Sequence, residues 1–177
     1  MIHVCTPFAR DKNLANAYNE AFERCPDGDW LCVRDQDTMF LTSDAINIMY
    51  EYVEKFPDTG LFTSFTNRIH PLAQDQLFLG VPSEDFDIKS WNYRAKIQAL
   101  SETKVSEIKR PISGFLMLIS KRVWSTIKFR GVGCLGVDNN FSADVLMSGK
   151  KIHRMDRLIV FHIYRLDNIK NKSHLLH

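Results

Sequence analysis

The sequence predicts an α/β domain with a mostly parallel central sheet and helices on both faces. Short apolar segments of strand length alternate with segments in which apolar residues recur at helical spacing. This alternation is typical of parallel sheets, because each helix returns the chain to the start of the next strand. The chain has 177 residues, 45% of them hydrophobic and 25% charged, enough for one substantial core and too few for two ordinary domains. We therefore expect one domain over 1–177.

The first predicted strand covers 2–8, and a helix with its apolar face in 14–22 follows, with Asp11 or Asn13 as its cap. A turn leads to a second apolar strand, 30–33, which runs directly into Asp35-Gln36-Asp37. Ligands of parallel α/β sheets bind beyond the carboxyl ends of the strands. We therefore expect these aspartates at the ligand-binding edge of the sheet.

The rest of the chain continues the pattern, apart from one long interruption. Segment 68–110 has little periodicity, so we expect a variable insertion that is functional or partly mobile, and we expect 166–177 to be a tail. The other predicted elements are, in order, a helix over 45–56 capped by Thr42 or Ser43, a strand over 61–66, a strand over 112–119, a short helix with apolar residues at 123, 124 and 127, a helix over 138–148, and strands over 151–155 and 158–161.

Composition and charge exclude several classes of function. The formal net charge of +2 and the lack of like-charge runs give no argument for nucleic acid as a partner. Four cysteines (Cys5, Cys25, Cys32 and Cys134) show no CxxC pairing and sit mostly in apolar segments, which favours reduced thiols and a cytoplasmic location. The first ten residues do not resemble a signal peptide, and no apolar run reaches transmembrane length. We expect a cytoplasmic protein without a membrane span.

Asp35 and Asp37 are the strongest candidates for metal ligands. Two positions apart at the end of an extended segment, they would point to the same side. Carboxylates suit Mg²⁺ or Mn²⁺, which take their remaining ligands from water and substrate phosphates. The alternative is a solvated turn in which Thr38 begins the next element, because Asp-x-Asp alone is a weak signal.

Four segments, in this order, resemble family 2 glycosyltransferases with the GT-A fold, a Rossmann-like arrangement. The first, 17–19 with 28–37, resembles the segment that leads into that family's DxD motif, and the second, 112–124, resembles its acceptor-side strand and the following helix. The third, 136–149, resembles its Glu-Asp helix. The fourth, 161–165, lies where many members place a histidine that binds the metal. The resemblance covers most of the chain outside 68–110.

This resemblance implies a role for each matching residue. Asp138 would be the general base that deprotonates an acceptor hydroxyl. Asp35 and Asp37 would hold Mn²⁺ or Mg²⁺ against the diphosphate of a nucleotide sugar, with His162 completing the metal shell. Arg165 would neutralise phosphate. The acceptor, whether glycan, lipid or protein, and the oligomeric state remain open. The alternatives are a plain helix cap for Asp138 and a structural role for His162, with His153, His174 and His177 as competing histidines.

Further candidates follow from position. Thr6, Pro7 and Phe8 end the first strand, where the family's nucleotide lies, and Arg10 could reach phosphate or base; the alternative is an ordinary strand exit. Gly114 would permit close approach of donor sugar or acceptor, or else mark a bulge. For the aromatic pair of the insertion, Trp91 and Tyr93, sugar stacking is possible and core packing is favoured.

The chain also departs from the family pattern in two places. A strand and helix that usually precede the DxD segment are missing, so no residue can be assigned to base recognition. Val137 stands where the family has the glutamate of the Glu-Asp pair. Two alternatives therefore remain: a catalytically silent module that binds a sugar or nucleotide, and a sugar nucleotidyltransferase, which usually begins with a glycine-rich phosphate loop that residues 1–15 lack.

Overall fold

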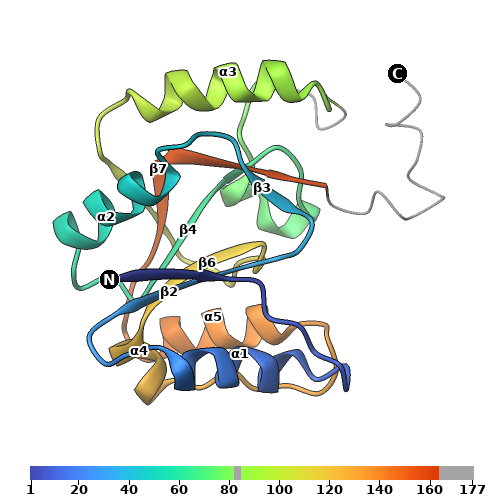
Figure 1. The fold of residues 1–177 in the computed structure, drawn as a ribbon, viewed down its shortest axis with the longest axis vertical. Helices are drawn as coiled ribbons and strands as arrows, with labels where there is room; N and C mark the ends of the chain where they lie inside the picture. Colours follow the sequence, from blue (N-terminus) through green and yellow to red (C-terminus); the bar gives the residue numbers. More distant parts are fainter. Residues whose placement is uncertain (82–84, 164–177) are drawn as a thin grey trace.

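The computed structural model describes residues 1–81 and 85–163, and these residues form an α/β structure around one open sheet (Figure 1). Within them, seven strands are arranged in the order β1-β2-β6-β4-β7-β3, and β5 also pairs with β7. The strands are β1 (Ile2–Cys5), β2 (Trp30–Arg34), β3 (Thr38–Phe40), β4 (Leu61–Thr66), β5 (Val105–Ile108), β6 (Leu116–Ser120) and β7 (Ile152–His162).

The sheet is mixed, so the expectation of a mostly parallel sheet is wrong. Strand β1 is parallel to β2, and β4 is parallel to β7, whereas β6 is antiparallel to both β2 and β4, and β3 and β5 are antiparallel to β7. The apolar pattern of a buried strand does not specify the strand's direction. Strands β5 and β6 both run opposite to β4 and β7, so the chain has already reversed its direction before the irregular segment 109–115 that leads into β6.

Helices cover both faces of the sheet, as predicted. Helices α1 (Leu14–Arg24), α4 (Lys121–Thr126) and α5 (Val137–Met147) lie together on the lower side of Figure 1, and α2 (Ala45–Lys55) lies on the other side. Side chains of β6 alternate between the two layers: Met117 and Ile119 join the core under α1, α4 and α5, while Leu116 and Leu118 join the core under α2.

Segment 68–110 contributes to the fold to a greater extent than its weak periodicity suggested. It contains the 3₁₀ helix η1 (Pro71–Gln76), helix α3 (Ile88–Ala99) and strand β5. Trp91 of α3 is fully buried, and its indole N–H donates a 2.6 Å hydrogen bond to the carbonyl of Asp85. Core packing is therefore its observed role, whereas Tyr93 is 68% exposed.

Two helix starts were predicted with different success. The side chain of Asn13 accepts a 3.2 Å hydrogen bond from the N–H of Asn16 and caps α1, as one of the two predicted residues. Helix α2 begins after Asp44, so the prediction of Thr42 or Ser43 as its cap is wrong. Several polar residues in succession offer a cap at adjacent positions, and sequence alone does not select one of them.

Strand β7 combines the two strands that the sequence predicted over 151–155 and 158–161. Its pairing with β4 shifts register between Ser64 and Phe65, where three residues of β7 (156–158) have no partner on β4. The part before the shift also pairs with β5, and the part after it pairs with β3. The second part carries His162 to the end of the sheet at which β2 ends.

Two further expectations from the sequence concern the cysteines and membrane-spanning helices. All four cysteines are free thiols, three of them at least partly buried and Cys134 exposed. Among the residues that the structure describes, no helix has the length and apolar character needed to cross a membrane.

Candidate metal centre and adjoining pocket

Asp35 and Asp37 lie in a tight turn between β2 and β3. The N–H and hydroxyl of Thr38 both donate to the carbonyl of Asp35, at 3.3 and 2.7 Å, and the guanidinium of Arg34 donates to the carbonyl and hydroxyl of Thr38. The convergence of the two carboxylates therefore comes from a turn, and the extended segment that the spacing argument assumed is not present. Thr38 begins β3, as the alternative interpretation expected, and both carboxylates remain partly buried.

His162 is the last residue of β7, and its surroundings fix its position. Its backbone N–H donates a 2.6 Å hydrogen bond to the side-chain oxygen of buried Asn67, and its ring stacks on Phe115 with 5.4 Å between centroids. The next residue, Ile163, donates its N–H to the carbonyl of Asp37 at 2.9 Å. The imidazole is thus held beside the aspartate turn by contacts with the residues that directly follow β4 and directly precede β6.

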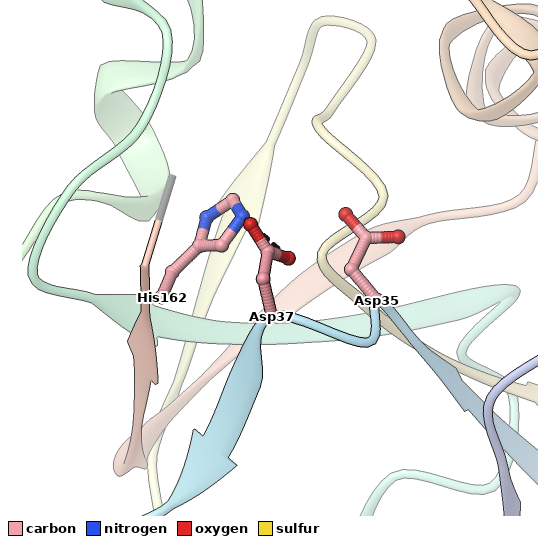
Figure 2. Close-up of side chains that lie close together, drawn as sticks. All are labelled: Asp35, Asp37 and His162. Atoms are coloured by element: carbon pink, nitrogen blue, oxygen red, sulfur yellow. Dashed lines mark ion pairs between the residues drawn. The ribbon is translucent and has the colours of Figure 1, made fainter. Parts of the chain in front are cut away.

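These three side chains form a group that fits a divalent cation. One ligand atom from each of Asp35, Asp37 and His162 lies within 4.8 Å of the others (Figure 2). The His162 Nε2 is 3.4 Å from Asp37 Oδ1. Two carboxylates and one imidazole suit Mn²⁺ better than Mg²⁺, which prefers oxygen ligands and retains several waters. All three metal ligands predicted from the sequence are brought together.

The pKa values of the two aspartates shift in opposite directions. Burial raises the pKa of Asp35 to about 6; the neighbouring His162 opposes this shift, and the charges of Asp37 and Asp138 add to it. Burial also acts to raise the pKa of Asp37, but its hydrogen bond and charge interaction with His162 outweigh burial, and the pKa falls below its ordinary value. A bound cation would therefore favour the ionised form of Asp35 most strongly.

Asp138 lies in the first turn of α5, on the other side of Asp35. One of its carboxylate oxygens, Oδ2, accepts a 2.6 Å hydrogen bond from the N–H of Gly114. The helix cap is Gly136, so Asp138 is not a helix cap. Its charge contributes to the raised pKa of Asp35, which places the two carboxylates in one electrostatic environment.

The structure shows a packing reason for glycine at position 114. A Cβ on Gly114 would lie 2.5 Å from the Cβ of Asp138, closer than two non-bonded carbon atoms can approach. Glycine is therefore needed here because α5 packs directly on this backbone. Gly114 therefore positions Asp138.

A pocket of about 540 Å³ adjoins the metal group. Thr6, Pro7 and Phe8 line it together with Asp35 and Asp37, as the position of β1 predicted. The other residues that line it are Ala9, Leu14, Tyr18, Arg34, Gln36, Cys134 and Ile163. A larger pocket of about 750 Å³ lies between α2 and α3, and none of the candidate residues lines it. We take the smaller pocket as the candidate site because it contains the convergent carboxylates.

The remaining candidates are not shown to belong to the pocket. Arg10 is exposed and is not among the residues that line the pocket, and Arg165, His174 and His177 lie outside the described residues. His153 is buried in β7, where its Nδ1 is 2.7 Å from the hydroxyl of Thr59, away from the metal group.

Three further residues of the site were not found from the sequence. Asn67 directly follows β4, so its place at a strand end, like that of Asp35, was an available signal. Arg34 lies on the predicted strand itself, and Tyr18 was taken only as part of the apolar face of α1. No signal in the sequence separates Tyr18 from the core residues on either side of it.

No protein-family model matches the sequence, and no curated protein matches it either.

Proposed function

We propose that this chain is a metal-dependent glycosyltransferase that moves a sugar from a nucleotide-diphosphate sugar to an acceptor hydroxyl. The observation that carries the proposal is the group of Asp35, Asp37 and His162, with ligand atoms within 4.8 Å of one another at a pocket of about 540 Å³. We also infer that the mixed α/β sheet is a shortened GT-A-like fold, because the order of the matching segments agrees with that family.

Asp35, Asp37 and His162 would hold Mn²⁺, and the ion when bound would neutralise the charge that grows on the departing nucleoside diphosphate. Thr6, Pro7 and Phe8 form the wall along which the nucleotide would lie. Arg34, which lines the same pocket, adds positive charge close to the phosphates.

Asp138 would act as the general base. Its Oδ2 is held by the Gly114 N–H, which fixes the carboxylate while Oδ1 has no such bond among the described residues. In an inverting transfer, the acceptor oxygen attacks the anomeric carbon, the bond from that carbon to the phosphate oxygen breaks, and the hydroxyl proton passes to Asp138. The nucleoside diphosphate leaves with the electron pair of the broken bond.

Calorimetry with a panel of nucleotide sugars, with and without Mn²⁺, tests the binding half of the proposal. We expect Mn²⁺-dependent binding that Asp37→Ala abolishes, because that variant removes one ligand of three. Asp58→Ala, which changes an exposed aspartate far along the chain, is the matched control and should bind as the parent does. Binding that is independent of Mn²⁺ or unchanged in Asp37→Ala would contradict the proposal.

Measurement of turnover distinguishes a glycosyltransferase from the two alternative functions, a silent binding module and a nucleotidyltransferase. We expect Asp138→Asn to bind donor normally and to lose turnover by about 100-fold or more, the range for removing a general base. A second candidate, a silent binding module, is favoured by one observation: Val137, at the family's glutamate position, is fully buried in the core and offers no polar group to an acceptor. Donor binding without transfer to any acceptor would support that module. Pyrophosphate release from a nucleoside triphosphate and a sugar phosphate would instead identify a nucleotidyltransferase.

A further inference from the structure

We propose that the hydroxyl of Tyr18 is a ligand-binding group of this site and donates a hydrogen bond to a phosphate oxygen of the bound nucleoside diphosphate. The inference rests on the proposed function, since it names an additional contact for the same donor. Tyr18 belongs to α1, which supplies no metal ligand and no candidate base.

Tyr18 combines a buried ring with a hydroxyl that makes no hydrogen bond among the described residues. The side chain is 2% exposed, and its ring packs edge-on against Phe129 with 4.7 Å between centroids. Tyr18 nevertheless lines the pocket beside the metal group, and within residues 1–81 and 85–163 its hydroxyl makes no hydrogen bond. The hydroxyl oxygen is not among the buried, unpaired polar atoms of the described residues, so it is accessible from the pocket that Tyr18 lines. A ligand in this pocket can therefore accept its hydrogen bond.

The neighbouring residue fixes α1, so the position of Tyr18 is determined by packing. The side-chain oxygen of Asn19 accepts hydrogen bonds from the indole N–H of Trp124 at 3.0 Å and from the N–H of Phe129 at 3.1 Å. Its amide also donates to the carbonyl of Phe129 at 2.9 Å. These bonds attach α1 to the segment that carries the ring against which Tyr18 packs. A group that is preorganised in this way loses little entropy when a ligand binds.

The surroundings of the Tyr18 hydroxyl favour its protonated form, which is a hydrogen-bond donor. Burial, and then the nearby charges of Asp35 and Asp138, hold the pKa of Tyr18 well above its ordinary value. The hydroxyl therefore stays protonated and can donate. Tyr18 and Asp35 line the same pocket, in which a diphosphate bound to the cation would present anionic oxygens. A hydrogen bond from a neutral donor to such an oxygen belongs to the stronger class.

Tyr18→Phe tests the inference, because it removes the hydroxyl and keeps the ring that packs on Phe129. Calorimetry with UDP, GDP, CDP and ADP in the presence of Mn²⁺ is the measurement. We expect the diphosphate that binds the parent protein to bind the variant about 10- to 100-fold more weakly, the range for a hydrogen bond to a charged group. Mn²⁺ titrated alone should bind parent and variant equally. Tyr93→Phe, which removes an exposed hydroxyl from α3, is the matched control and should change neither affinity.

The outcomes separate this inference from the proposed function. If the parent binds a nucleoside diphosphate and Tyr18→Phe binds it equally well, the inference is wrong and the proposed function stands. If Tyr18→Phe weakens Mn²⁺ binding by the same factor, Tyr18 acts through the metal group and the direct contact is wrong. If the parent binds none of the four diphosphates with Mn²⁺, the proposed function fails, and this contact fails with it. Thermal unfolding of both variants confirms that each is folded.

Discussion

At the scale of single residues, the candidate site contains a buried carboxylate, Asp35, whose negative charge destabilises the fold and would be stabilised by a bound cation. Asp35 and Asp37 are close in space but respond to the fold in opposite ways. The pKa of Asp35 is raised because its charge is buried, whereas that of Asp37 is lowered because His162 stabilises its charge. Functional sites often reduce stability in this manner.

Substitution of each aspartate should therefore change stability with opposite sign. Asp35→Asn removes an unfavourable charge and should raise the free energy of unfolding in metal-free buffer by about 1–3 kcal/mol, since each unit of pKa shift corresponds to about 1.4 kcal/mol. Asp37→Asn removes a favourable charge and should lower it. Denaturant unfolding with EDTA measures both. Stability changes of the same sign would contradict this account of the site.

The contact between Gly114 and Asp138 gives a second prediction. Gly114→Ala forces the new Cβ against the Cβ of Asp138 and should cost about 1–3 kcal/mol of stability, as overpacking does, while also displacing the proposed base.

The matched variant is Gly60→Ala, whose Cβ would meet the Cβ of Lys150 at 2.7 Å, away from the metal group. Both variants should unfold at lower denaturant concentration, but only Gly114→Ala should reduce donor turnover beyond the fraction unfolded. Equal turnover in the two folded variants would show that Gly114 is purely structural.

Candidate site residues could be predicted from the sequence where a charged or polar residue stands at the end of an apolar strand. Asp35, Asp37 and His162 each follow or end an apolar run, and charged or polar residues there have few structural uses. Arg10 has no such constraint, because a long exposed side chain one residue beyond the pocket wall is free to point to solvent. Tyr18 was missed because an aromatic at helical spacing has the pattern of a core residue, and its place in the lining of the pocket is visible only in three dimensions.

At the scale of elements, the helices were easier to predict than the strand directions. The period of 3.6 residues is local, and α1 and α5 were found within about two residues of their ends. The direction of β6, which is antiparallel to both β2 and β4, depends on partners from distant parts of the chain, and so does the union of two predicted strands into β7. Neither property is encoded in a short window of sequence.

Helix caps provide a prediction at this scale. Asn13→Ala removes the hydrogen bond to the N–H of Asn16 and should cost about 0.5–2 kcal/mol, independent of salt. Asp44 begins α2 without such a bond, so Asp44→Ala loses only a favourable charge near the helix N-terminus, about 0.3–1 kcal/mol at low ionic strength.

Unfolding at low and high salt distinguishes the two caps. The cost of Asp44→Ala should shrink in high salt, whereas that of Asn13→Ala should persist. A strongly salt-dependent cost at Asn13 would mean that the hydrogen bond is not what stabilises α1.

At the scale of the whole molecule, stability should depend on pH through His153. Burial between the two layers lowers its pKa below 6.5, and the charge of Glu107 opposes this while that of Lys151 adds to it. The unfolded chain therefore binds a proton more readily than the folded one, and stability is lost as pH falls below about 6.5. Asp35, whose pKa is raised, acts in the opposite direction, so a comparison with a variant is needed.

His153→Gln removes this proton-binding group and keeps a polar side chain that can hydrogen-bond to the hydroxyl of Thr59. Its free energy of unfolding should fall less between about pH 7.5 and about pH 5.5 than that of the parent protein. Equal slopes for the two proteins would show that His153 keeps an ordinary pKa in the folded state.

The placement of His162 also has a kinetic consequence. Asp35 and Asp37 follow β2, whereas His162 ends β7. An ion bound to all three residues would therefore cross-link two points of the chain that are separated by most of the described residues. Like a disulfide across a long loop, such a cross-link reduces the entropy gained on unfolding and must break before β7 can detach. Bound manganese would then stabilise the fold kinetically, and its removal by a chelator would accelerate unfolding even when no substrate is present.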